Sequence, residues 1–248
     1  MGSEIWNEIW NRVASRKTSS LIEKDGFEDA IPNIGCLNKL VFRMFSVCTK
    51  QIKSKSYLFS DSTIYLYPHY DFKRNIKILE VGAGSGMIIE RLTTLFNFPR
   101  NSIYACDFSD IAIENLEKML VPPGDILKCN ANEIDVYYIH EQFDIVFAHS
   151  IFQYFDDYQY ALKVVDSMYK LCKYGGTIFI NDVPDVSKID NIEDIRKSSN
   201  KDKHLYYPKE FFKYCSKILK TRYLIEYNDV NEYKYYNKRF NVILYKEN

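Results

Sequence analysis

The chain has 248 residues, which is enough for one large domain with a full hydrophobic core. Hydrophobic residues make up 46% of the chain and charged residues 27%, a balance that excludes an intrinsically disordered protein. The 33 basic and 33 acidic side chains cancel, which weighs against a general nucleic-acid-binding protein because such proteins usually carry a basic excess. We therefore expect one folded domain whose partner is not a nucleic acid.

The start of the sequence and the spacing of its cysteines bear on the compartment. The first residues do not combine a basic segment with an apolar run, as secretory signals do. No stretch of the sequence approaches the roughly 20 apolar residues that a membrane-spanning helix needs. The six cysteines are scattered without a paired C-x-x-C spacing, so neither a metal cage nor a disulfide framework is expected. We predict a cytoplasmic protein without a membrane partner.

Short apolar runs alternate with helical patterns over residues 76–182, which is typical of βα units and a parallel sheet. Strands are predicted at 76–81, 102–107, 126–129, 143–148 and 177–181. Helices are predicted after the glycine-rich turn that ends at Gly86, from the N-cap Ser109 to Met119, and over 156–172. Gly175 and Gly176 are interpreted as a helix stop.

The last part of the chain has a different pattern. A helix is predicted over 208–219, with Pro208 at its start. Two β-like runs follow at 221–227 and 240–245 without a helix between them, which favours an antiparallel pair at one edge of the sheet. Residues 1–75 are expected to form a helical cap, with an amphipathic helix near 3–14, on a core over 76–248.

A glycine-rich turn follows the first predicted strand. Gly82, Gly84 and Gly86 form a G-x-G-x-G pattern between that strand and a helix. Glycine permits positive φ and a close approach of the backbone to a ligand, and a helix start presents free N–H groups, so the combination indicates nucleotide binding. A dinucleotide fingerprint, G-x-G-x-x-G, would need glycine where Met87 stands, which weighs against a dehydrogenase.

Further polar residues follow the next strands. Asp107 ends the second strand, where a carboxylate can accept hydrogen bonds from both ribose hydroxyls of an adenosine. Asn130 and Ala131 follow the third strand, and residues 143–155 contain the fourth strand and its polar end. With Glu80 before the glycine turn, these features resemble the motifs of class I S-adenosylmethionine (SAM) dependent methyltransferases. Asn130 departs from the usual Asp of the family, although its amide oxygen can accept the same hydrogen bond.

The resemblance covers residues 76–182, somewhat under half of the chain. It implies a doubly wound, Rossmann-like α/β fold with a seven-stranded sheet and a reversed final strand. It also implies SAM as the cofactor, S-adenosylhomocysteine as the product, and no metal. The cofactor-binding residues that it implies are Glu80, Gly82, Ala83, Gly84, Gly86, Asp107, Phe108, Asn130, Ala131, Asn132 and His149.

Methyl transfer from a sulfonium requires alignment and exclusion of water, and a general base helps when the acceptor is a hydroxyl. His149 lies at the predicted end of the fourth strand, beside the expected methyl position, and is a candidate base. The other candidate catalytic residues are Asp182, His204 and Tyr206, and the candidate substrate contacts are Gln153, Tyr154 and Tyr207. Core packing, a turn and a solvated helix entry are the alternative interpretations of these residues.

We expect methyl transfer to a small polar molecule, on oxygen rather than nitrogen, by a monomer or homodimer. Trp6, Trp10, the segment 25–27 and the segment 204–209 are loosely similar to bacterial methyltransferases of capsule and surface-polysaccharide precursors. That similarity favours a sugar, a nucleotide-linked or a phosphoramidate-type acceptor. The alternatives are a small-molecule N-methyltransferase, a nucleic-acid methyltransferase and a non-catalytic SAM-binding partner subunit. The balanced charge argues against the nucleic-acid enzyme.

Overall fold

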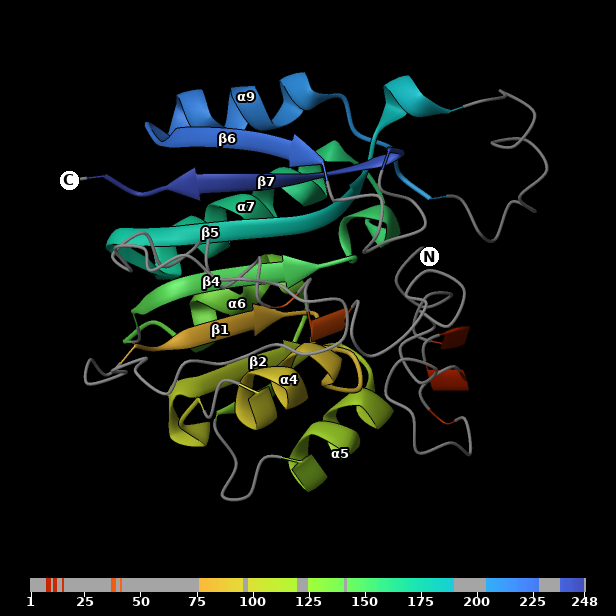
Figure 1. Cartoon of the computed structure of the whole chain (residues 1–248), viewed down its shortest axis with the longest axis vertical. Coiled ribbons are helices and arrows are strands. Elements are labelled where there is room, and N and C mark those ends of the chain that lie inside the picture. Colours follow the sequence, from red (N-terminus) through yellow and green to blue (C-terminus); the bar gives the residue numbers. More distant parts are fainter. Residues whose placement is uncertain are drawn as a thin grey trace, which may run out of the picture.

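The computed structural model describes residues 8–9, 11–12, 15, 37–38, 41, 76–95, 98–119, 125–140, 142–189, 204–227 and 237–247. A seven-stranded sheet with helices on both faces forms the body of this part (Figure 1). The predicted α/β class is therefore confirmed. The predicted cap over 1–75 and its helix at 3–14 fall outside the described residues, apart from the few positions just given. No helix in the described ranges is long and apolar enough to cross a membrane.

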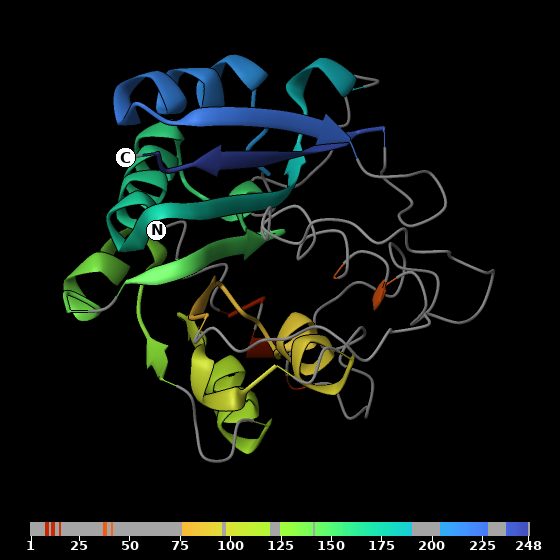
Figure 2. The ribbon, with the colours of Figure 1, turned by 60° about the vertical axis from the view of Figure 1, so that its left-hand side comes forward.

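The strands follow the order β3-β2-β1-β4-β5-β7-β6. The bounds are β1 Ile78–Val81, β2 Ile103–Asp107, β3 Ile126–Lys128, β4 Phe143–His149, β5 Cys172–Pro184, β6 Arg222–Tyr227 and β7 Arg239–Tyr245. The first five strands are parallel, and β7 runs antiparallel to both β5 and β6. This arrangement confirms the predicted final antiparallel pair, which lies side by side at one edge of the sheet (Figure 2).

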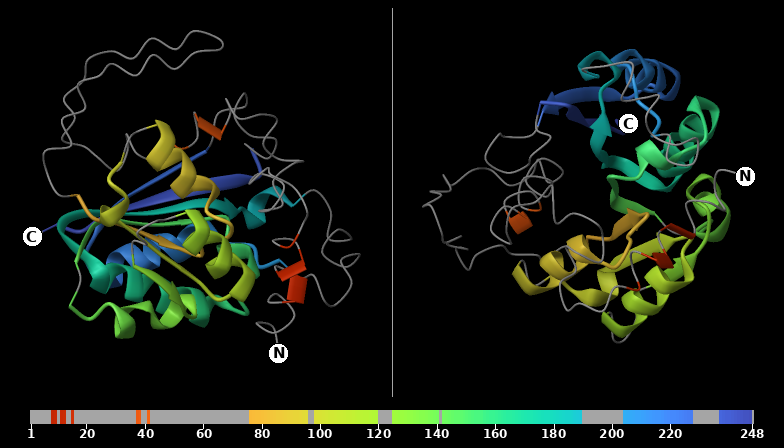
Figure 3. Two further views of the ribbon diagram at one scale, coloured as in Figure 1. Left: turned by 90° about the horizontal axis from the view of Figure 1, so that it is seen from below. Right: turned by 90° about the vertical axis from the view of Figure 1, so that its right-hand side faces the viewer.

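Helices cover the two faces of the sheet and bury two hydrophobic clusters. One cluster receives apolar side chains from α4 (Met87–Leu95) and α5 (Asp110–Met119). The other receives them from α6 (Ile134–Tyr137), α7 (Tyr158–Leu171) and α9 (Lys209–Leu219). The resulting three layers are visible when the molecule is seen from below (Figure 3). Because both faces are covered, the strands of the centre are apolar on both sides, as the sequence indicates.

Side chains at the helix starts explain where two of these helices begin. The Ser109 hydroxyl accepts a hydrogen bond from the Ala112 N–H at 3.3 Å, so Ser109 is the N-cap of α5 as predicted. The Asp157 carboxylate accepts one from the Tyr160 N–H at 2.7 Å and caps α7. Each cap satisfies a backbone donor that the helix itself leaves without a partner.

The junction between α7 and β5 differs from the prediction. β5 starts directly after the helix, so Gly175 and Gly176 lie inside the strand, and the predicted helix stop at these glycines is wrong. The Gly175 N–H donates to the Lys246 carbonyl at 2.7 Å, and the Lys246 N–H donates to the Gly176 carbonyl at 3.2 Å. Pairing with the C-terminal segment, which lies far away in sequence, therefore extends the strand.

The other end of β5 is also longer than predicted. The strand continues through Asp182 to Pro184, so Asp182 lies within the strand and not in a turn after it. Its φ is +65°, and the register with β7 shifts between Ile180 and Val183. A local irregularity therefore bends β5 near its carboxyl end. The candidate site forms at this edge of the sheet.

The two glycines of β5 provide a test of the packing at this junction. A Cβ at Gly176 would lie 2.7 Å from the Cys172 Sγ and 2.9 Å from the carbonyl oxygens of Asp144 and Lys173. We expect Gly176→Ala to lower the free energy of unfolding in urea by about 3 kcal/mol, because backbone atoms must move. Gly175→Ala is the control: φ is +79° there but open space surrounds the new methyl group, so we expect a loss of about 1 kcal/mol. A loss at Gly176 no larger than the loss at Gly175 would contradict this account.

Candidate active site

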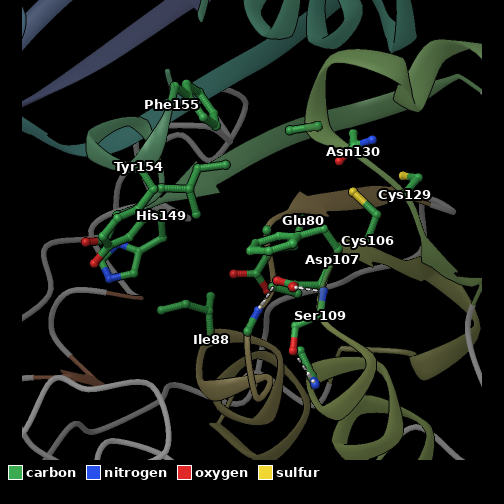
Figure 4. A pocket seen from close by; sticks show the side chains of 18 of the residues that line it. Glu80, Ile88, Cys106, Asp107, Ser109, Cys129, Asn130, His149, Tyr154 and Phe155 are labelled. Carbon is green, nitrogen blue, oxygen red and sulfur yellow. Dashed lines mark hydrogen bonds between the residues drawn. The ribbon is translucent and has the colours of Figure 1, made fainter. Parts of the chain in front are cut away.

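A pocket opens at the carboxyl ends of the central parallel strands (Figure 4). β1 lies between β2 and β4 in the sheet, so the chain reverses its winding direction at this point. Open α/β sheets bind ligands at such a switch point. Nine of the eleven predicted cofactor-binding residues line the pocket, all except Gly86 and Asn132.

The glycine turn forms one wall of the pocket. Gly82 and Gly84 have φ values of +72° and +54°, a region that residues with a side chain rarely adopt. The N–H groups of Gly82 and Ala83 both donate to the Cys106 carbonyl, at 2.8 and 3.0 Å. These bonds fold the turn back against the end of β2. These backbone contacts therefore help to hold the turn in position.

Asp107 connects the glycine turn with the start of α5. Its two carboxylate oxygens accept hydrogen bonds from the Gly84 N–H and the Ser109 N–H, both at 2.9 Å. Burial raises the pKa of the Asp107 carboxyl, and backbone hydrogen bonds from Ser109, Gly84 and Phe108 oppose that rise. Each carboxylate oxygen has a second lone pair, so the side chain can still accept ligand hydroxyls.

The remaining predicted cofactor contacts lie on either side of Asp107. Glu80, in β1, is 2% exposed and lines the pocket beside the glycine turn. Asn130 and Ala131 line it after β3. Asn132 lies outside the lining, and its carbonyl accepts a hydrogen bond from the Ser167 hydroxyl at 3.3 Å. Gly86 also lies outside; it has φ +87°, and its carbonyl accepts the first hydrogen bond of α4.

His149 lines the other end of the pocket, at the last position of β4. It is 7% exposed, and burial lowers the pKa of its imidazole to about 4. The Asp182 charge raises this pKa and the Arg239 charge lowers it, so the two effects oppose each other. Tyr154 lines the pocket near His149 (Figure 4), and burial raises the pKa of its hydroxyl. The imidazole is therefore neutral at pH 7.

A buried polar network lies behind His149. The Ser150 hydroxyl donates to the Asp182 carboxylate at 2.6 Å, and the same oxygen accepts from the Arg239 guanidinium at 2.7 Å. The Gln153 amide donates to the carbonyl and the hydroxyl of Ser150, at 2.7 and 2.8 Å. Asp182 and Gln153, predicted as a catalytic residue and a substrate contact, therefore lie in this network and not in the pocket wall.

The segment 204–207 packs beside the pocket without lining it. The His204 ring stands edge-on to the Tyr154 ring, with 5.4 Å between centroids. Tyr206 accepts a hydrogen bond from the Tyr158 hydroxyl through its backbone carbonyl. Tyr207 is fully buried, and its hydroxyl donates to the Phe152 carbonyl at 2.8 Å. The contacts of Tyr207 are those of a core residue, whereas the alternative that the sequence left open for this segment was a solvated helix entry.

Several pocket residues were missed by the sequence analysis. They are Met87, Ile88, Cys106, Ser109, Ala112, Cys129, Ser150, Ile151, Phe155, Asp156 and Tyr160. Most of them stand one or two positions along the chain from a predicted site residue, and this proximity in sequence could have identified them. Ala112 and Tyr160 stand further along the chain from any predicted site residue. The capped start of α7 brings Tyr160 to the pocket wall. Among the described residues, no group of three or more His, Cys, Asp and Glu side chains is arranged to hold a metal ion.

Comparison with known proteins agrees with this geometry. Residues 79–178 match the family model described as "Methyltransferase domain". They form a class I SAM-dependent methyltransferase domain. NodS, an N-methyltransferase of Bradyrhizobium japonicum WM9 solved with S-adenosylhomocysteine, has the same fold, with a TM-score of 0.60 at 11% identity over 98% of each chain. The magnesium protoporphyrin IX methyltransferase of Synechocystis PCC 6803, solved with SAM, gives a TM-score of 0.54 at 8% identity, covering 99% of this chain and 91% of that one.

Curated relatives match less than half of this chain. Malonyl-[acyl-carrier protein] O-methyltransferase 1 of Ilyobacter polytropus is 30% identical over 108 residues, which are 43% of this chain and 37% of that protein. Chondramide synthase cmdD of Chondromyces crocatus is 30% identical over 118 residues, 46% of this chain and 3% of that protein. The chain thus spans little more than a third of the first relative and a small part of the second. Their names do not point to capsule-precursor chemistry.

The position of Asp107 predicts that its carboxylate contributes to S-adenosylhomocysteine binding by the methyltransferase domain. We expect Asp107→Asn to weaken S-adenosylhomocysteine binding by about 10- to 100-fold in calorimetry, because charge-assisted hydrogen bonds to the ribose are lost. Asp110→Asn is the matched control: that carboxylate stands at the start of α5, is 63% exposed and pairs with Lys128. Equal losses of affinity in the two variants would contradict a ribose contact by Asp107.

The low pKa of His149 predicts a pH dependence of stability. Below pH 6.5 the unfolded chain binds a proton at this residue that the folded protein excludes until about pH 4, so stability falls as the pH falls through this window. The loss attributable to His149 reaches about 3 kcal/mol at most at the acid end. Urea unfolding at pH 7 and pH 5 should show a smaller decrease in His149→Gln than in wild type. Parallel decreases would show that the folded imidazole titrates normally.

Proposed function

We propose that the chain transfers the methyl group of SAM to an oxygen atom of a small polar molecule. The observation that carries the proposal is the pocket itself, which runs from the Asp107 carboxylate, held by two backbone N–H groups, to the neutral imidazole of His149. This arrangement supports a ribose contact at one end and a methyl acceptor at the other. The match over residues 79–178 supports the reaction class.

The residues of the pocket fit SAM by their chemistry. Asp107 offers a carboxylate to ribose hydroxyls, and Asn130 and Ala131 offer polar backbone and amide groups after β3. The buried carboxylate of Glu80 lies beside the glycine turn, where it suits the cationic part of the cofactor. Phe155 and Tyr160 add apolar surface to the wall. These six residues are the ones that would hold the cofactor.

Bound SAM supplies an electrophilic methyl group on a sulfonium centre. The chain has to place the acceptor oxygen in line with it and exclude water, and both tasks are served by the buried end of the pocket near His149 and Tyr154. The neutral imidazole accepts a hydrogen bond from the acceptor hydroxyl. His149 would take up the hydroxyl proton as the acceptor oxygen receives the methyl group that SAM would supply. The low pKa of His149 makes it a weak base, so most of the catalysis comes from positioning.

The acceptor does not follow from the curated relatives. The region that matches the family model ends at residue 178, before the polar end of β5 and before β7. All residues that line the pocket, from Glu80 to Tyr160, lie within the matched region. The acceptor class is therefore argued from the residues around His149, one of which, Asn181, lies beyond that region.

Methyl-labelled SAM provides the test. We expect the purified wild-type chain to move label into the low-molecular-mass fraction of a cell extract, and Asp107→Asn to reduce that rate at limiting SAM by about 10- to 100-fold. Asp110→Asn should retain the wild-type rate. Treatment of the extract with nucleases and protease before the reaction should leave the incorporation unchanged. Label found only in nucleic acid or protein would contradict a small-molecule acceptor, and label bound to nitrogen would contradict O-methylation.

A further inference from the structure

Asn181 is a buried polar residue that the domain's internal contacts do not explain. It lies in β5 and is 1% exposed. Its backbone carbonyl accepts a hydrogen bond from the Ser150 N–H at 3.0 Å. Its side-chain amide is different: within the described residues, neither the nitrogen nor the oxygen has a hydrogen-bond partner. Most buried polar groups in folded proteins are hydrogen-bonded, so such an amide requires an explanation.

The neighbouring asparagine shows that this environment can satisfy an amide. Asn241 in β7 is also 1% exposed, and its side-chain oxygen accepts a hydrogen bond from the Asp182 N–H at 3.0 Å. Asn241 therefore has a structural role that fixes the irregular end of β5. Asn181, one residue before Asp182, has no comparable contact, although it is equally buried.

The register of the sheet places Asn181 next to His149. The two residues are direct partners in the parallel pair of β4 and β5. Phe147 and Phe179, two positions earlier in each strand, are also partners and pack in the same hydrophobic cluster. Because side chains alternate along a strand, Asn181 projects from the same face of the sheet as His149, about 5 Å away across the strands. Asn181 does not itself line the pocket, but it lies one strand beyond His149, directly beside the pocket end that His149 lines.

The charges beside Asn181 compensate one another. Asp182 and Arg239 form an ion pair at 2.7 Å, and the same carboxylate accepts the Ser150 hydroxyl. The positive and negative groups are therefore already engaged behind the strand end. A neutral amide therefore stands next to a neutral imidazole on this face of the sheet.

We propose that Asn181 binds the methyl acceptor through an uncharged group, a hydroxyl or a carboxamide, that lies next to the methylated oxygen. The inference rests on the proposed function. An amide presents one donor group and one acceptor oxygen, and a hydroxyl or carboxamide matches both. A carboxylate or phosphate can only accept, so it would pair with the Asn181 NH2 group and leave the buried Asn181 oxygen without a donor. Asn181 is thus a specificity-determining residue for a neutral acceptor.

Stability measurements separate this role from a structural one. Asn181→Leu keeps the branched shape and removes both polar atoms, so without ligand its Tm should equal the wild-type value or exceed it by about 2–4 °C. Asn241→Leu is the matched control and should lower the Tm, because the Asp182 N–H loses its acceptor. A Tm of Asn181→Leu that falls as far as that of Asn241→Leu would overturn the proposal, because the amide would then have a structural partner.

Methyl transfer gives the second measurement. With methyl-labelled SAM and the low-molecular-mass extract as probes, we expect Asn181→Leu to lose at least about tenfold in rate at limiting extract. Its affinity for S-adenosylhomocysteine should remain at the wild-type value. The labelled product, identified by mass spectrometry, should carry a hydroxyl or carboxamide next to the new methoxy group.

The outcomes distinguish the two proposals. Transfer by wild type together with equal transfer by Asn181→Leu would overturn the role of Asn181 alone. A product that carries a carboxylate or phosphate next to the new methoxy group would also overturn the role of Asn181 alone. A wild-type chain that binds S-adenosylhomocysteine but transfers no label to small molecules would overturn the proposed function, and the acceptor role of Asn181 with it.

Discussion

The buried carboxylate of Asp107 is the constraint on which the rest of the site depends. Desolvation disfavours its charged form, and only the backbone N–H groups around it offset that cost. Two of these donors come from separate segments, Gly84 in the glycine turn and Ser109 at the start of α5. One side chain thus joins the end of β2, the turn after β1 and the start of a helix. The shape of the pocket at this end follows from that junction.

The two ends of the pocket have different electrostatics. Glu80 and Asp107 bring two buried carboxylates to the cofactor end, which suits a ligand that carries a positive sulfonium and a ribose. At the other end the carboxylate of Asp182 is paired with Arg239. Oppositely charged groups that satisfy each other contribute little net field. A methyl acceptor therefore meets hydrogen-bonding groups there, while the cofactor meets charge.

The elements that could be predicted from the sequence are those that a short stretch of neighbouring residues determines. Apolar runs identified all seven strands, and the signal is continuous in central strands such as β1 and β4 because these are buried on both faces. Glu80, the glycine turn and Asp107 were identifiable because short spacings fix their positions relative to strand ends. The extent of β5 was not predictable, because pairing with Lys246, more than 60 residues further along the chain, decides that Gly175 and Gly176 are part of a strand.

Residues of the acceptor end were harder to place for the same reason. The position of Tyr207 in the core depends on its bond to the Phe152 carbonyl, which no sequence pattern encodes. Asp182 looked like a turn residue because an Asp shortly before a proline favours turns. The structure instead places it in β5 at positive φ, bonded to two partners from distant segments. Contacts between distant segments thus decide the geometry of this half of the site.

Backbone strain shows how that geometry is maintained. Ser150 and Asp182 both have positive φ, +55° and +65°, a conformation that costs a residue with a side chain about 1–3 kcal/mol. They stand at the ends of adjacent strands, and their side chains form a 2.6 Å hydrogen bond. Each strained position is therefore held by the other and by Arg239. The strain turns the chain sharply after His149 and fixes the imidazole at the pocket end, next to Asn181 in the neighbouring strand.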